Sequence, residues 1–338
     1  MTTPFSSVAA FQEMLASAPA QHSDAMAAAQ ERNGQLTKPP GALGRLEYLA
    51  IWYAGWRGTA RPQIMRPQVV VFAGNHGVTA QGVSAFPAEV TAQMVQNFEQ
   101  GGAAINQLAN CFGARVDVHA LSLESPTVDF TAAPAMNDVE FLKALEIGWQ
   151  AVDADSDILI CGEMGIGNTT AAAAIALALF GGEASDWVGR GTGVDDAGLA
   201  NKARVVEKGV ALHGNSAQTG LDVLRCLGGR ELAAIAGAIA RARMLRIPVI
   251  LDGFICTAAA ACLDQPRRGA LDHCVAGHVS VEPGHARLLD ALEKVALLSL
   301  GMRLGEGSGA ALALGVLKGA VACHSGMASF AEAGVSKT

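Results

Sequence analysis

Glycine-rich segments that also carry ionisable side chains recur along the 338-residue chain. In RLGEGSGA (303–310), glycines flank Glu306 between two apolar stretches. A carboxyl group removed from water has a raised pKa, which makes it a competent general base near neutral pH. An exposed loop glutamate is the alternative at this position. The pattern therefore makes Glu306 a candidate base.

The segment GEMGIGNTT (162–170) has the composition of an anion-binding loop. Its glycines permit a ligand to approach the backbone, and a helix predicted over 171–180 offers free N–H groups at its start. Thr169 or Thr170 is expected to cap that helix. The glycine spacing is similar to that of a P-loop, but Asn168 stands where the essential lysine belongs, which argues against an ATPase. The GxGxxG fingerprint of dinucleotide-binding proteins is not matched either.

A second loop, GRGTGVDD (189–196), is suited to a phosphate or a ribose. Asp195 and Asp196 are metal-ligand types, but capping of a helix predicted over 197–209 is the favoured role. Lys202 lies in that helix, and a solvated lysine is the alternative to a contact with the phosphate loops. Two such loops side by side favour a nucleotide monophosphate as the ligand.

Other ionisable residues carry weaker signals. LDGF (251–254) has one acid after a predicted strand, where diphosphate-sugar transferases usually show a pair, and this argues against magnesium–diphosphate chemistry. His273, Cys274 and His278 match no standard zinc spacing. His76 in GNHG donates a hydrogen bond or caps a turn, and the sequence does not decide between the two.

Apolar runs are expected to form the strands that position these loops. Candidate strands cover residues 68–72, 115–119, 157–161, 186–188, 247–251 and 278–281. Continuous apolar character is typical of strands buried on both faces, and the alanine-rich helices between them favour right-handed βαβ units and a parallel sheet. Ligands of such sheets bind outside the carboxyl ends of the strands, where five glycine-rich loops are expected to meet.

Composition restricts the class of protein. The chain is 51% hydrophobic and 16% charged with a net charge of −7, which excludes a disordered chain and disfavours nucleic acid as a partner. No apolar run reaches the ~20 residues of a membrane span, and the N-terminus lacks the basic region of a signal peptide. Seven cysteines without a CxxC pair favour reduced thiols in the cytoplasm.

Seven segments, in order, resemble the nicotinate-nucleotide–dimethylbenzimidazole phosphoribosyltransferase family. They are KPPGALGRLE (38–47), AGNHGV (73–78) with GVSAFPAEVTAQM (82–94), GEMGIGNTTAAAA (162–174), GRGTGVDD (189–196), VILDGF (249–254), EPGHARLL (282–289) and MRLGEGSGAALA (302–313). The resemblance covers the chain from about Lys38 to its C-terminus. One departure is Ala42, where the family often has serine.

The resemblance implies a Rossmann-like three-layer α/β/α fold with a mainly parallel sheet. It also implies a small helical lobe, so that residues 60–290 form a large domain and residues 1–59 and 291–338 the lobe, in a homodimer. The implied reaction transfers 5-phosphoribosyl from nicotinate mononucleotide to 5,6-dimethylbenzimidazole, giving α-ribazole 5′-phosphate and nicotinate for the lower-ligand nucleotide of cobalamin. No cofactor, metal, nucleic acid or membrane is expected to take part.

The resemblance also implies roles for individual residues. Glu306 matches the family's catalytic glutamate, Glu163 a second family acid and Lys202 a family lysine. The residues expected to hold the phosphate are Gly165, Ile166, Gly167, Asn168, Thr169, Gly191, Thr192 and Gly193. Those expected to line the base pocket are Met164, Ser84, Gln93 and Leu304. The alternatives are an enzyme of this fold with another acceptor, such as adenine or a phenol, and a non-enzymatic nucleotide-binding sensor.

Overall fold

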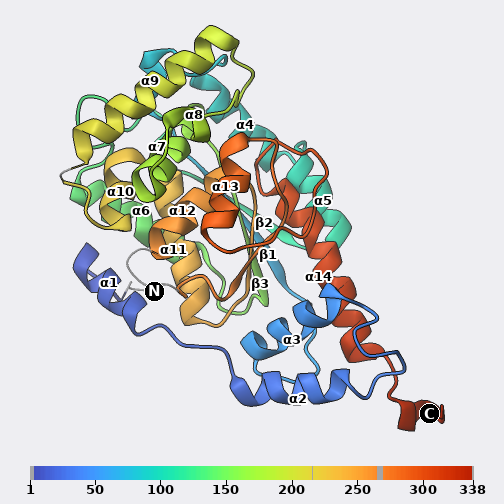
Figure 1. Cartoon of the computed structure of the whole chain (residues 1–338). Helices are drawn as coiled ribbons and strands as arrows, with labels where there is room; N and C mark the ends of the chain where they lie inside the picture. The colour runs from blue at the N-terminus through green and yellow to red at the C-terminus, as the bar shows by residue number, and fades with distance from the viewer. Residues whose placement is uncertain (1–3, 215, 265–268, 337–338) are drawn as a thin grey trace.

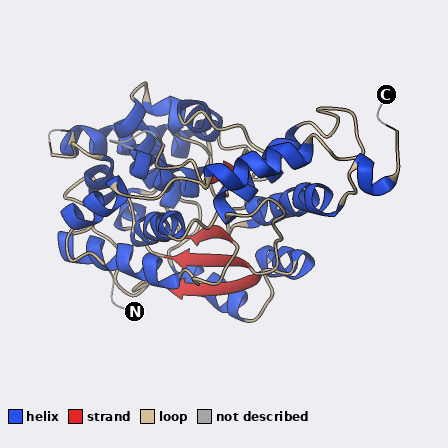
Figure 2. Ribbon diagram, turned by 90° about the horizontal axis from the view of Figure 1, so that it is seen from below, coloured by secondary structure: helices blue, strands red, loops and turns tan. Residues whose placement is uncertain are grey.

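The computed structural model describes residues 4–214, 216–264 and 269–336, and a parallel sheet lies between two layers of helices (Figures 1 and 2). The strands are β1 (Pro67–Ala73), β2 (Arg115–Ala120), β3 (Ile158–Met164), β4 (Val249–Leu251) and β5 (Cys274–Ala276). Their order in the sheet is β2-β1-β3-β4-β5, and each neighbouring pair is parallel. The predicted α/β class with a parallel sheet is confirmed.

Helices connect and cover these strands. They are α1 (Val8–Ala16), α2 (Ser23–Asn33), α3 (Arg45–Arg57), the 3-10 helix η1 (Gly77–Gln81), α4 (Glu89–Glu99), α5 (Ala104–Phe112), α6 (Asp138–Ala151), α7 (Asn168–Phe180), α8 (Ala184–Trp187), α9 (Asp196–His213), α10 (Gly220–Leu227), α11 (Arg230–Met244), α12 (Phe254–Asp264), α13 (Pro283–Ala291), α14 (Ser308–Gly326) and α15 (Phe330–Ala333). The helices predicted after the two phosphate loops are therefore present, as α7 and α9.

The inner strands are buried on both faces, as their continuous apolar sequences predict. Val70 and Leu159 point into a core that α6, α7, α11 and α12 share. Val69, one residue before Val70, and Ile160, one residue after Leu159, point into the opposite core beneath α3, α5 and α14. This alternation follows from the two-residue period of a strand. The sheet is therefore a rigid base from which loops leave at one edge.

The predicted strand at 186–188 is wrong, because the chain forms the short helix α8 there. The side chain of Asp186 accepts a hydrogen bond from the N–H group of Glu183 at 3.2 Å, which closes the first turn. The indole N–H of Trp187 donates to the carbonyl oxygen of Gly181 at 2.8 Å. Local caps of this kind outweigh the strand preference of a three-residue apolar run.

The predicted strand at 278–281 is also wrong, because β5 ends at Ala276. A Cβ atom on Gly277 would stand 2.8 Å from the Cα atom of Ala310, so this point of the chain is pressed against α14. Beyond it, His278 pairs with Leu298 in an isolated bridge, outside the named strands. The segment therefore leaves the sheet and becomes a loop that faces the carboxyl ends of the strands.

The N-terminal segment of the chain packs on both faces of the sheet. Near the N-terminus, the Phe5 ring lies 5.4 Å from the Trp149 ring of α6. Helices α2 and α3 instead lie beside α14 (Figure 1), and Arg32 of α2 donates to the carbonyl oxygen of Met327 at 2.8 Å. The division into a domain over 60–290 and a lobe from 1–59 and 291–338 stays a prediction.

Helix α14 is, within the described ranges, the helix long and apolar enough to cross a membrane by length and composition. Half of its apolar window is buried inside the protein. Ala310, Leu314 and Leu317 pack into the core beneath the sheet, which is the position of a core helix.

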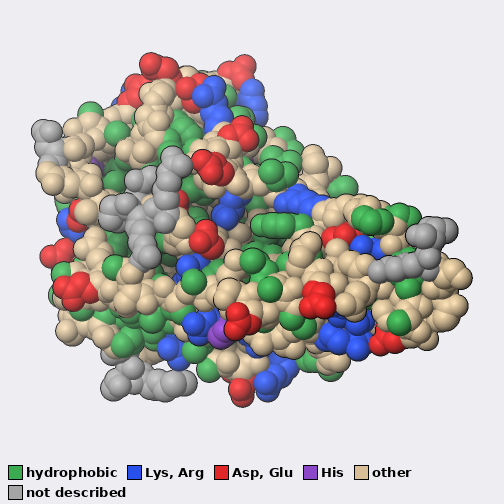
Figure 3. Space-filling view, turned by 60° about the horizontal axis from the view of Figure 1, so that its bottom comes forward, with side chains coloured by type: hydrophobic (Ala, Val, Ile, Leu, Met, Phe, Trp, Pro, Cys, Tyr) green, Lys and Arg blue, Asp and Glu red, His purple; other side chains and the backbone are tan. Residues whose placement is uncertain are grey.

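On the face drawn in Figure 3, acidic and basic side chains are interspersed.

Candidate active site

A cavity of about 520 Å³ opens at the carboxyl ends of β3 and β4. It receives side chains and backbone from the loops after β3, β4 and β5, from α4 and from the segment that precedes α14. The lining residues are Phe86, Val90, Met94, Glu163, Met164, Gly165, Ile166, Asn168, Thr169, Gly191, Thr192, Gly253, Phe254, Ile255, His278, Ser280, Glu282, Arg303, Leu304, Gly305 and Glu306. This is the sheet edge at which parallel α/β proteins bind their ligands.

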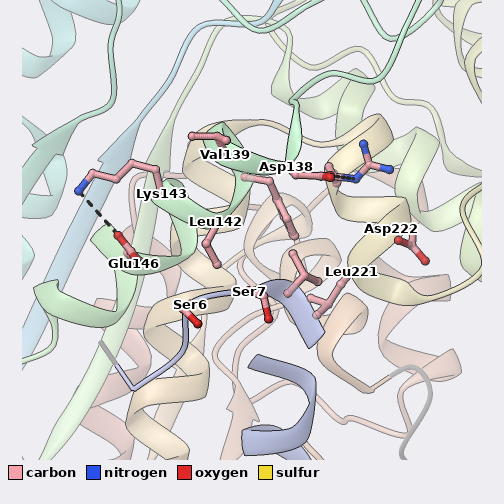
Figure 4. A pocket seen from close by; sticks show the side chains of 12 residues that line it. Ser6, Ser7, Asp138, Val139, Leu142, Lys143, Glu146, Leu221 and Asp222 are labelled. Atoms are coloured by element: carbon pink, nitrogen blue, oxygen red, sulfur yellow. Dashed lines mark ion pairs between the residues drawn. The ribbon is translucent and has the colours of Figure 1, made fainter. Parts of the chain in front are cut away.

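A second hollow of about 690 Å³ lies away from this edge, between the start of α1, α6 and α10 (Figure 4). Its charged side chains pair with one another, since Lys143 lies 3.8 Å from Glu146 and Arg225 lies 3.3 Å from Asp138. Val139 at its rim is an exposed apolar residue. Paired surface ions offer no acid–base centre, so the candidate active site is the cavity at the strand ends.

Glu306 stands at the wall of that cavity with 5% of its surface exposed. Burial, and then the nearby charge of Asp252, raise the pKa of Glu306 to about 7. Its Oε2 atom has no hydrogen-bond partner among the residues that the structure describes. A desolvated, unpartnered carboxyl with a pKa near neutrality is well suited to accept a proton from a ligand. The alternative of an exposed loop glutamate is excluded.

Glu163, near the end of β3, faces the same cavity and is 6% exposed. Burial raises its pKa to about 8, and the charge of Asp252 adds to that rise. A hydrogen bond from the Nδ2 group of Asn168 opposes it. Two carboxyl groups with different pKa values in one site can take different protonation states. As the pH rises, the carboxyl group of Glu306 therefore loses its proton before that of Glu163.

The loop after β3 leads into α7 as predicted, but the cap differs. The N-cap is Gly167, with a φ of 95° and no side-chain cap, so the prediction that Thr169 or Thr170 caps the helix is wrong. Only a residue without Cβ fits comfortably, because a Cβ on Gly167 would lie 2.9 Å from the Cγ2 atom of Thr79. The first residues of α7, Asn168 and Thr169, line the cavity, where the positive end of the helix dipole favours an anion.

Lys202 is buried, with 1% of its surface exposed, so it is not a solvated helix lysine. Its Nζ atom donates to the carbonyl oxygen of Gly189 at 2.8 Å and to Thr169 Oγ1 at 3.1 Å. Burial lowers the pKa of Lys202 to about 8, and the charge of Glu282 opposes that change. Lys202 thus places a cation between the two predicted phosphate loops.

The loop 189–193 follows α8 and not a strand, yet it reaches the same cavity. The N–H group of Gly191 donates to Glu282 Oε1 at 3.0 Å. Gly191 and Thr192 line the cavity, and Gly193 follows them directly. Thr192 Oγ1 lies 3.1 Å from Ser84 Oγ, which joins this loop to the segment that precedes α4. The two loops together close one side of the cavity.

The residues predicted for the base pocket lie in different environments. Met164 and Leu304 line the cavity, and Leu304 is 57% exposed at its mouth. Ser84 reaches the rim through Thr192. Gln93 is exposed on α4, whose Val90 and Met94 line the cavity.

Three of the side chains considered as metal ligands, Asp195, Asp196 and His273, have other partners. Asp195 caps α9 by accepting from the Gly198 N–H group at 2.8 Å, which is the favoured role predicted for it. Asp196 pairs with Arg190. The Nε2 atom of His273 lies 3.0 Å from the carbonyl oxygen of Ile239. In the described part of the chain, no group of three or more His, Cys, Asp or Glu side chains can hold a metal ion.

His76, whose role the sequence left open, points into the protein interior. Its Nε2 atom contacts Glu231 Oε1 of α11, and both side chains are fully buried. It precedes η1 but makes no side-chain cap. Gly74 and Gly229 leave room for the pair, since a Cβ on either would come within 3 Å of a Glu231 oxygen.

Comparison with known proteins identifies the family. A family model described as phosphoribosyltransferase matches residues 18–335. The chain belongs to this phosphoribosyltransferase family. It is 71% identical over 336 residues, 99% of each chain, to the nicotinate-nucleotide–dimethylbenzimidazole phosphoribosyltransferase of Ruegeria pomeroyi. It is 56% identical over 326 residues, 96% of each chain, to the enzyme of that name from Rhizobium meliloti.

Solved structures agree with the family. The crystal structure of CobT from Thermus thermophilus matches with a TM-score of 0.87 and 41% identity, over 93% of this chain and 100% of that one. The resemblance that the seven sequence segments indicate is therefore confirmed, together with the three-layer fold.

Several cavity residues of this phosphoribosyltransferase were not singled out from the sequence. They are Phe86, Val90, Met94, Phe254, Ile255, Ser280, Glu282 and Arg303. Most lie within the seven family segments or beside them, so membership of these segments was the sequence feature that could have identified them. Glu282 is an acid in a loop after a predicted strand. His278 was considered only as a metal ligand, because its neighbours in space are far from it in sequence.

Proposed function

We propose that the chain transfers the 5-phosphoribosyl group of nicotinate mononucleotide to 5,6-dimethylbenzimidazole. The products are α-ribazole 5′-phosphate, for the lower-ligand nucleotide of cobalamin, and nicotinate. The names of relatives that match almost the whole chain support this reaction. The observation that carries it is the buried, unpartnered Oε2 atom of Glu306 at the cavity wall.

The proposed role of Glu306 is to accept a proton from the acceptor base. One ring nitrogen of the benzimidazole attacks C1′ of the ribose, and the proton on the other ring nitrogen must leave as the bond forms. A carboxylate with a pKa of about 7 is ionised in part at neutral pH and accepts that proton. Attack from the face opposite to nicotinate converts the β-configured donor into an α-configured product.

Charge development at the ribose also suits this cavity. The transition state carries positive charge on the ribose ring, and the Glu306 carboxylate stabilises it from close by. The leaving pyridinium nitrogen becomes neutral as its bond to C1′ breaks, so its departure requires no metal ion. Glu163, with a pKa of about 8, keeps its proton and adds no second negative charge to the site.

The donor phosphate fits the two loops beside Lys202. The start of α7 presents the positive end of a helix dipole to the cavity at Asn168 and Thr169. Gly191 and Thr192 line the cavity from the other loop, and Lys202 adds a buried cation that bonds to Thr169. Backbone groups and one lysine thus hold the anion in a chain that is acidic overall.

The acceptor base fits the apolar end of the cavity. Phe86, Val90, Met94, Met164 and Leu304 supply the apolar surface there. A flat aromatic acceptor buries its faces against such side chains, while its ring nitrogens remain free for C1′ and for the base. Ser84 and Gln93 stay predictions for this subsite.

Incubation of the purified protein with nicotinate mononucleotide and a panel of acceptors tests the proposal. The panel contains 5,6-dimethylbenzimidazole, adenine and phenol, and the products are separated by chromatography and identified by mass. We expect α-ribazole 5′-phosphate as the main product. Product from phenols alone would contradict the acceptor assignment. Tight nucleotide binding without turnover on any acceptor would favour a sensor.

We further propose a cytoplasmic homodimer. All seven cysteines are free thiols, in keeping with a reducing compartment. Tyr48 and Val295 are exposed apolar residues, 61% and 73% respectively, on segments that Arg45 joins by a hydrogen bond to Ala296. Exposed apolar side chains of this size favour association. Light scattering should give a mass twice the 34.6 kDa of one chain, and a monomer mass would contradict the proposal.

A further inference from the structure

Asp252 connects the end of β4 to the segment that carries Glu306. It follows Leu251 directly and is 1% exposed. Its Oδ2 atom accepts a hydrogen bond from the N–H group of Gly307 at 3.2 Å, and its Oδ1 atom accepts one from Ala310 at 2.8 Å. A carboxylate from one element thus caps the start of α14, and one of the N–H groups it binds is adjacent to Glu306.

The backbone at Glu306 needs such an anchor. Glu306 has a φ of 65°, in the left-handed region that residues with a Cβ rarely adopt, and Gly305 and Gly307 beside it have φ values of 86° and 87°. A conformation of this kind persists only where the surroundings fix it. Gly162 contacts the Glu306 carbonyl from the β3 side, and Asp252 holds the next N–H group.

His278 lies on the other side of Asp252. Its Nε2 atom is 3.7 Å from Asp252 Oδ1, the ring is 2% exposed, and it lines the cavity. Neither ring nitrogen has a hydrogen-bond partner in the described ranges. The ring also packs on the first turn of α14, since a Cβ on Gly309 would stand 2.0 Å from its Cδ2 atom.

The ionisable groups around Asp252 come from every neighbouring element. They are Glu163 on β3, Cys256 on α12, His278 after β5 and Glu306 before α14. Burial raises the pKa of Asp252, while His278 and the two backbone N–H groups oppose that rise. The hydrogen bonds from Gly307 and Ala310 favour the ionised form of Asp252 against that burial, and the charge of Asp252 contributes to the raised pKa of Glu306.

We infer that Asp252, supported by His278, is a positioning residue for the base: it fixes the backbone that presents Glu306 and holds a second negative charge behind it. The inference rests on the proposed function, because it requires Glu306 to accept a proton. The charge of Asp252 adds to burial in raising the pKa of Glu306 to about 7. Loss of that charge therefore makes Glu306 a weaker base that stays ionised to lower pH.

The test is the pH profile of kcat in Asp252→Asn. We expect kcat at its plateau to fall about tenfold or more, because the weaker base accepts the proton less readily. The acid limb of the profile should move to lower pH by about one unit, since one of the charges that raise the pKa of Glu306 is lost. KM for nicotinate mononucleotide should change less than about threefold, because Asp252 contributes to the base and not to the phosphate loops.

Asp157→Asn is the matched control. Asp157 is a buried carboxylate that accepts a hydrogen bond from the Arg66 N–H group at 2.8 Å, but it precedes β3 at the opposite edge of the sheet. Its replacement should lower stability and leave the acid limb of the profile in place. A loss of activity in Asp252→Asn without movement of the limb would show a purely structural role and overturn the inference.

His278→Gln keeps the inference testable if Asp252→Asn fails to fold. Removal of the imidazole takes away a group that opposes the rise in the pKa of Asp252, so less negative charge stands behind Glu306. The acid limb should move in the same direction by a smaller amount, and an unmoved limb would overturn the inference. Absence of turnover in the unmodified protein would instead overturn the proposed function, so the two failures are distinguishable.

Discussion

The carbonyl oxygen of Glu306 lies directly against the Cα atom of Gly162, near the end of β3. A Cβ atom built on Gly162 would stand 2.2 Å from that oxygen and 2.8 Å from the backbone nitrogen of Gly307. Real Cβ atoms do not approach backbone so closely. The missing side chain of Gly162 therefore permits the backbone of the candidate base to rest on the sheet, and it links the position of Glu306 to a rigid strand.

Replacement of Gly162 by alanine should displace the base. We expect kcat to fall by ~10-fold or more, because a shift of an ångström in a reacting group is costly. The free energy of unfolding should fall by ~1–3 kcal/mol, as in overpacked cores. Steady-state kinetics and urea unfolding measure the two effects.

Gly319→Ala is the control for this substitution. Gly319 is exposed on α14, and a Cβ there meets nothing within 4 Å. Alanine in a helix interior is ~0.5–1 kcal/mol more favourable than glycine, so this variant should be slightly more stable and fully active. A fully active Gly162→Ala variant would contradict the importance of the contact.

The sequence predicted those parts of the site that local patterns encode. The apolar run before Gly162 and the glycines around Glu306 indicate a strand and a secluded acid, and both are present, although β3 continues three residues beyond the predicted end, to Met164. It did not predict that Gly162 and Glu306 touch. That contact joins residues 144 positions apart (306 minus 162), and no local pattern records it.

The errors have a related physical cause. The run at 186–188 is apolar enough for a strand, yet local hydrogen bonds make it helical. His278 and Asp252 lie in different loops of the sequence, and only the parallel order of β4 and β5 brings them together. Lys202 carries no sign of burial in its sequence neighbours. Its environment depends on how α9 packs on α7, which is a tertiary property.

Glu306→Gln should reduce turnover by at least ~10²-fold, the usual size of a general-base contribution. Glutamine has nearly the same shape and no basic carboxylate, so both substrates should still bind. Single-turnover kinetics measure the chemical step, and calorimetry measures binding of nicotinate mononucleotide. Glu207→Gln, at an exposed position on α9, is the control. A turnover rate in Glu306→Gln close to that of the unmodified protein would show that another group takes the proton.

The rate should depend on pH through Glu306. Its pKa is raised to about 7, and the base works only when ionised, so kcat should fall as the pH decreases through 7. At one unit below the pKa, about a tenth of the plateau rate should remain. A pH profile of kcat between pH 5 and 9 measures the limb. A flat profile down to about pH 5 would mean that the working base has the pKa of an ordinary glutamate.

The free energy of unfolding should fall as the pH rises, because of Glu163. Its pKa is raised from 4.5 to about 8 in the folded protein, so the folded state holds a proton that the unfolded state releases. The stabilisation from this group is fully present below about pH 4.5 and is lost as the pH rises through about 8. The slope is at most ~1.4 kcal/mol per pH unit.

Urea unfolding of Glu163→Gln at several pH values tests this expectation. Glutamine does not titrate, so the fall in unfolding free energy between pH 5.5 and 8.5 should be smaller in the variant than in the unmodified protein. Part of the fall should remain, because the pKa of Glu306 is also raised by burial. An unchanged slope would show that Glu163 is ionised throughout that range.

Lys202→Met should weaken binding of the donor more than it slows the chemical step. Methionine fills most of the same buried space but loses the charge and the hydrogen bonds to Gly189 and Thr169. A hydrogen bond to a charged group contributes ~1.5–3 kcal/mol, which corresponds to a rise of ~10–100-fold in KM for nicotinate mononucleotide. KM for 5,6-dimethylbenzimidazole should change little, because the apolar end of the cavity lies on other elements.

The matched control is Lys208→Met, at an exposed position on the same helix, which should leave both KM values unchanged. Equal effects of Lys202→Met on the two KM values would indicate that the helix has moved, since a specific phosphate contact affects the donor alone. An effect on kcat alone would instead place Lys202 at the reacting atoms. The ratio of the two KM changes therefore distinguishes a binding cation from a structural one.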